Sequence, residues 1–301
     1  MPRVSVVINT QNSSRFLRET LNSLLAQSFR DWEAVIWDNA SADDTADIVH
    51  SYGEARFRFF EDPEKVSLYQ SRVNALWQCT GDMVAFLDHD DVWVSDKLQH
   101  QVLVFDNPDT VASATDFLII RSPNRLDLTD QSAKLCRTYR SRVTSRLNLS
   151  RHYRVAMSTL MARTDIARVA LPNPAPELSV IEDFDIVFRL LAHGALEPIA
   201  RPLMLYRLHG SNFSSNTEAH RLEVDIWSRS YSPLPGEEGD AAAIRAAVGD
   251  SYLRATARRA LAIGDRQFAF CLSRQMTWSL DRVKITAALA LPRSTLARLA
   301  R

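Results

Sequence analysis

The sequence has few cysteines, no excess of either charge and no glycine-rich nucleotide loop. Its three cysteines, Cys79, Cys136 and Cys271, are scattered without a CxxC pair, so we expect neither disulfides nor structural zinc. Lysine plus arginine and aspartate plus glutamate each total 36 among 301 residues, and a chain without net charge has no overall field that attracts nucleic acid. No GxGxxG motif follows a strand-like run, which excludes a nicotinamide-dependent enzyme.

Long hydrophobic runs are missing as well. The N-terminus enters a strand-like pattern at Val4 without the basic stretch and long apolar run of a secretory signal. The longest apolar run near the end, Ile285–Leu291, is far shorter than the roughly 18 residues that a membrane span requires. Together with the unpaired cysteines, these absences predict a reduced, cytoplasmic protein.

Strand-like and helical patterns alternate in the first half of the chain. Short apolar runs are separated by segments with apolar residues at helical spacing. The expected strands are Val4–Asn9, Glu33–Trp37, Phe57–Phe60 and Met83–Leu87, and the expected helices are Ser13–Gln27, Asp43–Tyr52 and Ser67–Cys79. This alternation predicts an α/β fold with a mostly parallel central sheet flanked by helices.

The second half is less regular, and the arginine-rich stretch from Ser122 to about Val155 resists assignment. The expected elements around it are the helices Lys97–Phe105 and Asp183–His193 and the strands Ala112–Ile120, Ser158–Ala162 and Leu203–Leu208. Past residue 216 only two helices are expected, Ala241–Ala262 and Asp265–Leu280. We therefore expect one domain over residues 1–215 and a helical C-terminal region over residues 216–301.

Polar residues follow three of the expected strands, at the sheet edge where open α/β folds bind ligands. The strongest cluster is Asp88-His89-Asp90-Asp91, whose three carboxylates repel one another and favour a hard divalent cation such as Mg²⁺ or Mn²⁺. If the segment is extended, Asp88 and Asp90 share one side and form the metal-side pair, and His89 is not a ligand. The alternative is a solvated turn in which Asp91 or Ser95 caps the next helix.

Three other polar positions each admit two interpretations. Asp38 either braces the turn after its strand or accepts a hydrogen bond from a bound base. Asp183 falls on the apolar face of its helix, opposite Glu182 and Asp185, and is either an N-cap or a general base in a partly desolvated cleft. The segment Tyr206–Asn212 either cradles a diphosphate through its arginine and histidine or forms a polar turn.

Taken together, these segments resemble family-2 glycosyltransferases of the GT-A fold over residues 3 to about 215. The similarity lies in five collinear segments, with departures at Gln11, Asn39, Ala40 and Val73. The matching segments are Val4–Asn12, Asp38–Ser41 with Asp44-Thr45, Arg72 before Gly81, Phe86–Asp91, and Glu182–Arg189 with Tyr206–His209.

The resemblance implies a role for each matching residue. Thr10 and Asp38 would hold the nucleotide base, and Arg72 would assist with the nucleotide. Asp88 and Asp90 would bind the ribose and the metal, Asp183 would deprotonate the acceptor hydroxyl, and Arg207 and His209 would contact the diphosphate or the metal. The implied activity is metal-dependent, inverting transfer from a nucleoside-diphosphate sugar to a glycan or lipid-linked acceptor, in cell-surface glycan or polysaccharide biosynthesis.

Two rival functions remain beside this one. A sugar-nucleotidyltransferase would carry a glycine-rich phosphate loop after the first strand, where this chain has Asn9-Thr10-Gln11-Asn12. A non-catalytic nucleotide-sugar or glycan-binding module of the same fold would lose Asp90 or Asp183, and both are present. Release of nucleoside diphosphate distinguishes the enzyme from the module.

Basic residues are concentrated in two stretches of this neutral chain. Nine lie between Arg121 and Arg154 against two acids, and ten lie after Tyr252 against two acids. Each Lys or Arg near an anionic leaflet contributes about 1 kcal/mol to binding. We therefore expect peripheral contact with the cytoplasmic membrane face, the alternative being an ordinary solvated basic surface.

Overall fold

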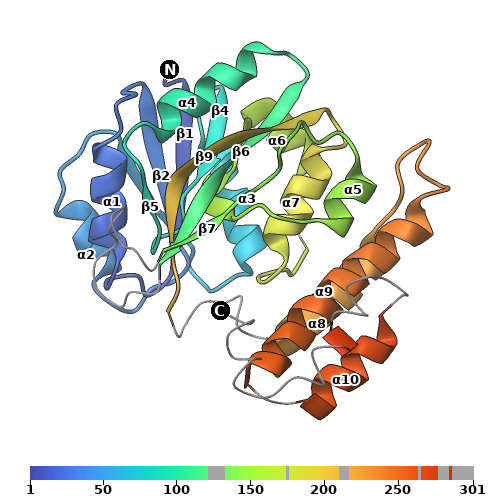
Figure 1. Cartoon of the computed structure of the whole chain (residues 1–301). Coiled ribbons are helices and arrows are strands. Elements are labelled where there is room, and N and C mark those ends of the chain that lie inside the picture. Colours follow the sequence, from blue (N-terminus) through green and yellow to red (C-terminus); the bar gives the residue numbers. More distant parts are fainter. Residues whose placement is uncertain (121–132, 174–175, 210–216, 264–265, 277–284, 287–301) are drawn as a thin grey trace. The chain divides into compact units, whose positions relative to one another are not determined.

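The computed structural model describes residues 1–120, 133–173, 176–209, 217–263, 266–276 and 285–286 (Figure 1). The chain forms two compact units. The first contains Met1–Ser145 and Arg154–Ser215, and the second contains Arg146–Tyr153 and Asn216–Arg301. The second unit is therefore not contiguous in sequence, because a short piece from the unassigned stretch joins it. That residues 1–215 form a domain of their own stays a prediction.

The first unit is built on a nine-stranded sheet with the order β3-β2-β1-β4-β8-β6-β9-β5, and β7 pairs with β6. Most paired residues lie in the parallel pairs β1–β2, β2–β3, β1–β4 and β6–β9. The strands are β1 Val4–Thr10, β2 Trp32–Asp38, β3 Phe57–Glu61, β4 Met83–Phe86, β5 Val92–Trp93, β6 Thr110–Ile120, β7 Lys134–Cys136, β8 Met161–Arg163 and β9 Ala195–Arg207. The expected mostly parallel α/β sheet is thus confirmed, with β5, β7 and β8 as short antiparallel strands. Of these three, only β8 overlaps an expected strand.

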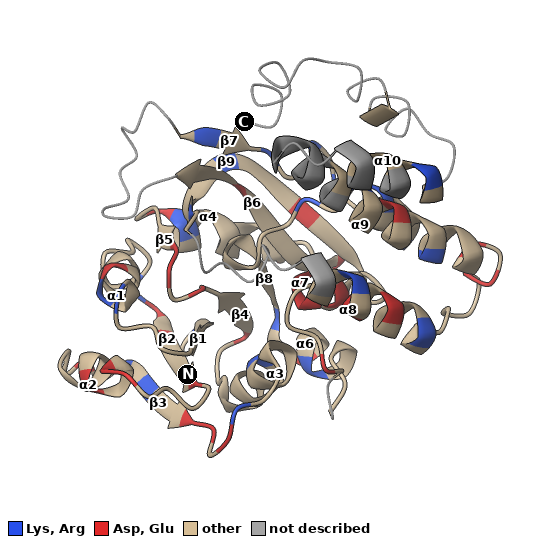
Figure 2. Ribbon diagram, turned by 90° about the horizontal axis from the view of Figure 1, so that it is seen from below, with Lys and Arg blue, Asp and Glu red and all other residues tan. Residues whose placement is uncertain are grey.

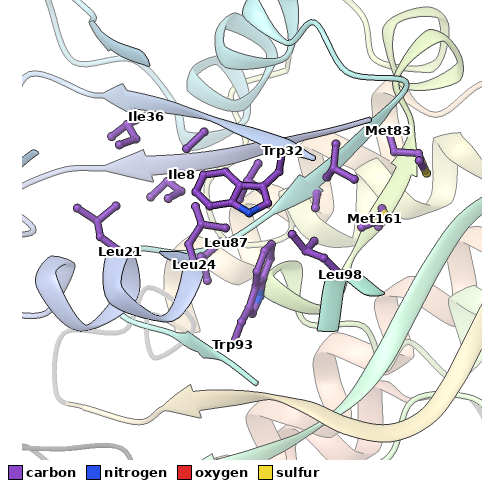
Figure 3. Close-up of a cluster of buried hydrophobic side chains, with 14 of the residues drawn as sticks. Ile8, Leu21, Leu24, Trp32, Ile36, Met83, Leu87, Trp93, Leu98 and Met161 are labelled. Atoms are coloured by element: carbon purple, nitrogen blue, oxygen red, sulfur yellow. The ribbon is translucent and has the colours of Figure 1, made fainter. Parts of the chain in front are cut away.

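Helices pack on both faces of this sheet, which is why every residue of β1 is buried. They are α1 Leu17–Leu25, α2 Thr45–His50, α3 Leu68–Gln78, α4 Lys97–Leu103, α6 Thr164–Ala170 and α7 Glu182–Leu190, with 3₁₀ turns at Val104–Asp106 and Met157–Thr159. On one face, Leu21 and Leu24 of α1 and Leu98 of α4 pack with Ile8 and Trp32 in a single apolar cluster (Figure 3). On the other face, α3 packs against β1 and β2.

Helix α1 begins at Leu17, four residues later than the sequence pattern predicts. The reason is a set of hydrogen bonds that ties the preceding loop to the loop after β2. The backbone amide of Ser13 donates to Thr45 Oγ1 (2.9 Å), and that of Ser14 donates to Asp43 Oδ2 (3.0 Å). Because these amides point at the neighbouring loop, the two loops after β1 and β2 hold each other at the carboxyl edge of the sheet.

The second unit is helical. It consists of α5 Arg146–Arg151, α8 Thr217–Ser230, α9 Ala241–Ile263 and α10 Arg266–Gln275. Helices α5, α8 and α10 each pack against α9. The two expected C-terminal helices are found, although the last residues expected in the second lie outside the described part of the chain, and α5 and α8 were not predicted. Among the described helices, none is both long and apolar enough to cross a bilayer.

The loop after β2 contains Ala40 in a left-handed conformation with φ of 55°. An alanine there is strained by about 1–2 kcal/mol relative to glycine, because its Cβ crowds the following carbonyl. We predict that Ala40→Gly raises the melting temperature, with a net gain of up to about 1 kcal/mol after the added entropy of the unfolded glycine.

The matched control is Ala42→Gly, two residues away and equally exposed, where the backbone is not left-handed. This substitution should lower the melting temperature, because it adds unfolded-state entropy and relieves no strain. Differential scanning fluorimetry of both variants is the measurement. Equal losses in the two would show that residue 40 carries no strain.

Candidate active site

The parallel strands β1, β2 and β4 bring their carboxyl ends to one edge of the sheet. Thr10 and Asp38 end their strands side by side as register partners, and the Thr10 hydroxyl donates to Asp38 Oδ1 (2.7 Å). The Leu87 amide, just past β4, donates to the Val7 carbonyl (2.9 Å), which holds the start of the acidic segment against β1. The positions that the sequence singled out after these strands therefore lie at one edge.

Asp38 is 2% exposed and already accepts three hydrogen bonds. Besides Thr10, its donors are the Ser41 hydroxyl (2.6 Å) and the Ser41 amide (2.8 Å). Next to it is a cavity of about 470 Å³, lined by Asp38, Ala40, Ser41, Glu61, Asp62 and Pro63. This volume lies in the usual range of small-molecule sites. Asp38 thus braces the turn after its strand, as one interpretation predicts, and it also forms part of the wall of a pocket. A hydrogen bond to a bound base stays a prediction.

The acidic segment after β4 is a turn, so the condition of an extended segment, on which the shared side of Asp88 and Asp90 depended, is not met. The Asp91 amide donates to the Asp88 carbonyl (3.1 Å), which closes the turn. Asp91 is buried and accepts from Ser158 Oγ (2.6 Å) and from the Arg207 amide (3.1 Å). Burial and the neighbouring carboxylates of Asp90 and Asp88 raise the pKa of Asp91 well above its usual value.

Asp91 therefore does not cap the next helix, whose N-cap is Asp96. Its partner Ser158 also accepts from the Asp88 amide (3.0 Å), so the same hydroxyl contacts both ends of the turn. Ser158 lies in the 3₁₀ turn before β8, where a strand was expected. No motif signals its role in the sequence, because its partners come from distant segments.

Arg72 of α3 connects this turn to the start of α7. Its Nη2 atom lies 2.8 Å from Asp88 Oδ1 and 3.4 Å from Glu182 Oε1. The guanidinium is buried, and its Nε and Nη1 atoms have no hydrogen-bond partner among the described residues. Burial raises the pKa of Glu182 to about 8 against the opposing effect of Arg72, and the nearby charges of Asp183 and Asp88 add to the rise.

The acidic residues of helix α7 are buried and exposed differently from what its helical periodicity predicts. Glu182 and Asp185 are buried instead of solvated, because they pair with Arg72 and with Arg189 (2.6 Å), respectively. Asp183 is partly exposed, and its Oδ1 accepts from the Phe184 amide (2.6 Å). It is not the N-cap, which is Ile181. The carboxylate expected to be most buried is thus the one that solvent reaches.

The end of β9 carries Arg207 and, two residues on, His209. His209 Nε2 lies 2.8 Å from Asp90 Oδ2, and Arg207 Nε donates to the Asp90 carbonyl (3.0 Å). Burial raises the pKa of Asp90, but the hydrogen bond and charge of His209 outweigh it and leave this pKa low. Arg207 also pairs with Glu19 of α1, a partner that no sequence motif indicated.

Phe16 packs beside this pair. Its ring lies 5.1 Å from the His209 ring and 4.3 Å from the Arg207 guanidinium carbon. Such cation–π contact fixes the orientation of the guanidinium.

Asp90 and His209 offer oxygen and nitrogen ligands at one point, and Asp88 is on the same turn. Within the described residues, no group of three or more His, Cys, Asp or Glu side chains forms a ready metal site. A Mg²⁺ or Mn²⁺ ion bound largely through a substrate diphosphate needs only one or two protein carboxylates. The donor set at Asp90 and His209 therefore fits such an ion.

Comparison with known proteins places these residues in a family context. Residues 5–169 match the sequence model described as glycosyl transferase family 2. An uncharacterized glycosyltransferase of Nostoc sp. is 29% identical over 220 residues, which is 70% of this chain and 66% of that protein. The Escherichia coli UDP-Glc:α-D-GlcNAc-diphosphoundecaprenol β-1,3-glucosyltransferase WfgD is 28% identical over 99 residues, which is 33% of this chain and 39% of that protein. The chain thus spans less than two thirds of the length of these relatives.

Solved structures share the fold at low sequence identity. S. aureus TarS in complex with UDP-GlcNAc aligns with a TM-score of 0.64 and 16% identity, over 99% of this chain and 90% of that one. The mannosyltransferase PcManGT of Pyrobaculum calidifontis, in complex with GDP-Man and Mn²⁺, aligns with a TM-score of 0.58 and 17% identity, over 99% of this chain and 84% of that one. These likenesses confirm the expected GT-A fold, and the family match confirms the resemblance seen in the motifs. The chain belongs to glycosyl transferase family 2.

Proposed function

We propose that this chain is an inverting glycosyltransferase that uses a nucleoside-diphosphate sugar and acts in cell-surface glycan or polysaccharide biosynthesis. The observation that carries the proposal is the Asp88–Arg72–Glu182 chain of contacts. It connects the turn at the end of β4, where a donor diphosphate would bind, to the residue before Asp183. A carboxylate that solvent can reach is thereby fixed beside the donor site.

The proposed reaction needs one base and one leaving group. Asp183 takes the proton from the acceptor hydroxyl, whose oxygen forms a bond to the anomeric carbon as the bond to the diphosphate oxygen breaks. The nucleoside diphosphate leaves on the opposite side, so the configuration inverts. Arg207 and His209 would stabilise the negative charge that develops on the departing phosphate.

The cofactor of the proposal is a divalent metal, Mn²⁺ or Mg²⁺. Asp90 and His209 would hold it, with Asp88 on the same turn. When bound, it would supply positive charge against the diphosphate. Thr10 and Asp38 would support the base pocket, and Arg72 would keep Asp88 oriented toward the nucleotide.

The acceptor in this proposal is a glycan or a lipid-linked glycan. WfgD, by its name, acts on a diphosphoundecaprenol-linked sugar, which is the chemical class that we propose. The basic stretches support contact with an anionic membrane surface. Arg254, Arg258 and Arg259 lie on α9, and Arg266 and Arg274 on α10. Figure 2 shows Lys and Arg positions in blue along the described parts of these helices. The other basic residues after 276 lie outside the described part of the chain.

The base is tested by Asp183→Asn. The amide keeps the size of the side chain and an oxygen for the Phe184 amide, but it cannot accept a proton. We predict that kcat falls roughly 10²- to 10⁴-fold while donor binding is nearly unchanged. Nucleoside diphosphate release and calorimetry with the donor are the measurements.

The matched control is Asp165→Asn. Asp165 is also an aspartate in the first turn of its helix, and it accepts from the next amide (2.8 Å) as Asp183 does. This variant should keep full activity. A proportional loss of donor binding in Asp183→Asn would make Asp183 a structural residue.

The metal is tested by removal. We predict that a nucleoside diphosphate binds at least tenfold more weakly in excess chelator, because the Asp88 and Asp90 carboxylates then repel the phosphates. Isothermal titration calorimetry with and without Mn²⁺ measures the difference. Asp90→Asn should abolish the dependence of binding on Mn²⁺. If the unsubstituted protein binds the nucleoside diphosphate equally well with and without chelator, the metal has no role in binding.

Membrane contact is tested by sedimentation with vesicles. We predict that the full chain pellets with anionic vesicles at low salt and less at physiological salt, and that it stays in solution with neutral vesicles. Equal recovery in the supernatant under all four conditions would show that the basic residues form an ordinary solvated surface.

A further inference from the structure

The pocket beside Asp38 is lined by acidic residues and by no basic residue. Three of its six lining residues, Asp38, Glu61 and Asp62, are carboxylates, and none is basic. Asp38 and Glu61 are register partners at the ends of β2 and β3, so their side chains are on the same face of the sheet. A phosphate group would be repelled here, whereas a neutral nucleobase with N–H groups would be attracted.

Two of the three carboxylates are already engaged. Asp38 accepts from Thr10 and twice from Ser41. Asp62 accepts from Trp37 Nε1 at one oxygen (2.7 Å) and from Asn74 Nδ2 at the other (3.1 Å). Glu61 is exposed, and its side-chain carboxylate makes no hydrogen bond or ion pair with any described residue. Of the lining carboxylates, it alone has both oxygens available to a ligand.

Hydrogen-bond donors in the lining are correspondingly scarce. The Ser41 hydroxyl and amide both donate to Asp38. The Asp62 amide donates to the Asp38 carbonyl (2.8 Å). These three groups are therefore unavailable to carbonyl oxygens of a base. The lining offers acceptors and lacks free donors at these positions.

Nucleobases differ in what they present to such a lining. Guanine presents N1–H and its 2-amino group side by side, which match the two oxygens of one carboxylate in parallel hydrogen bonds. Uracil presents a single N3–H between two carbonyl oxygens, and the Ser41 and Asp62 donors that could meet these oxygens are already taken. Hydrogen bonds to a charged acceptor are the stronger kind, and a polar group left unpaired costs binding energy.

From this lining we infer that the donor nucleotide is a guanosine diphosphate sugar and that Glu61 selects the base. The inference rests on the proposed glycosyltransferase function and adds the identity of the base. Glu61 binds N1–H and the 2-amino group of guanine, while Asp38 and Asp62 shape the pocket without contacting the base. Because Glu61 is exposed and forms no ion pair with the described residues, its carboxylate can bind a ligand without breaking an existing ion pair.

The experiment compares GDP and UDP by calorimetry on the full chain in the presence of Mn²⁺. We expect GDP to bind roughly 10- to 100-fold more tightly than UDP, the range of one charge-assisted hydrogen-bond pair. In Glu61→Gln the preference should fall below about threefold, because the amide replaces one acceptor with a donor. The melting temperature of this variant should match that of the unsubstituted protein.

The matched control is Glu64→Gln, an exposed glutamate three residues on that does not line the cavity. It should keep the full preference for GDP. Tighter binding of UDP would overturn the inference and leave the proposed function intact, since a nucleotide is bound. A GDP preference that survives in Glu61→Gln would remove Glu61 from base selection. Absence of binding by either nucleotide would contradict both the inference and the proposed function.

Discussion

The buried guanidinium of Arg72 is the interaction on which the arrangement of the site depends. It lies between Asp88, at the end of β4, and Glu182, at the start of α7, and these residues are 94 positions apart in the chain. Breaking a buried ion pair by removing one partner commonly costs about 3–5 kcal/mol, because the other charge stays desolvated. Here the loss would leave two carboxylates facing each other. One arginine therefore keeps the turn after β4 and the start of α7 in a fixed relation.

A second network supports the same turn from the other side. Asp91 accepts from Ser158 and from the backbone of Arg207, so it connects the segment after β4 with the 3₁₀ turn before β8 and with the last residue of β9. Asp90, the preceding residue, forms an ion pair with His209. Each of the three aspartates in the motif has its own partner, and their mutual repulsion is reduced by these separate contacts. The motif thus connects three segments that lie far apart in the sequence.

The sequence predicted the fold and the edge where the site lies, but not the pairing of charges. Periodicity was sufficient for β1, β2 and β4, whose residues are nearly all buried on both faces, and for α3, which has one apolar face including Val73 and Leu76. It failed for α7, where Glu182 and Asp185 are buried through partners on α3 and on α7 itself. Helical periodicity cannot indicate a charge that is compensated by a distant arginine. For the same reason the contacts of Glu19 and Ser158 could not be predicted. Their partners, Arg207 on β9 and Asp91 after β4, are distant from them in the sequence.

The second helical unit adds a constraint of a different kind. Helix α5 comes from residues between two parts of the first unit, yet it packs on α9, and its Arg146 pairs with Glu237 (2.8 Å). A deletion of residues 216–301 would therefore remove α9 from a helix that remains in the shortened protein and leave Arg146 without the Glu237 carboxylate. The connectivity requires the backbone to leave the first unit, form α5 and return before the last strands of the sheet are complete. No single cut in the backbone can separate the two units, so gene truncations that aim to isolate the sheet must also redesign residues 146–153.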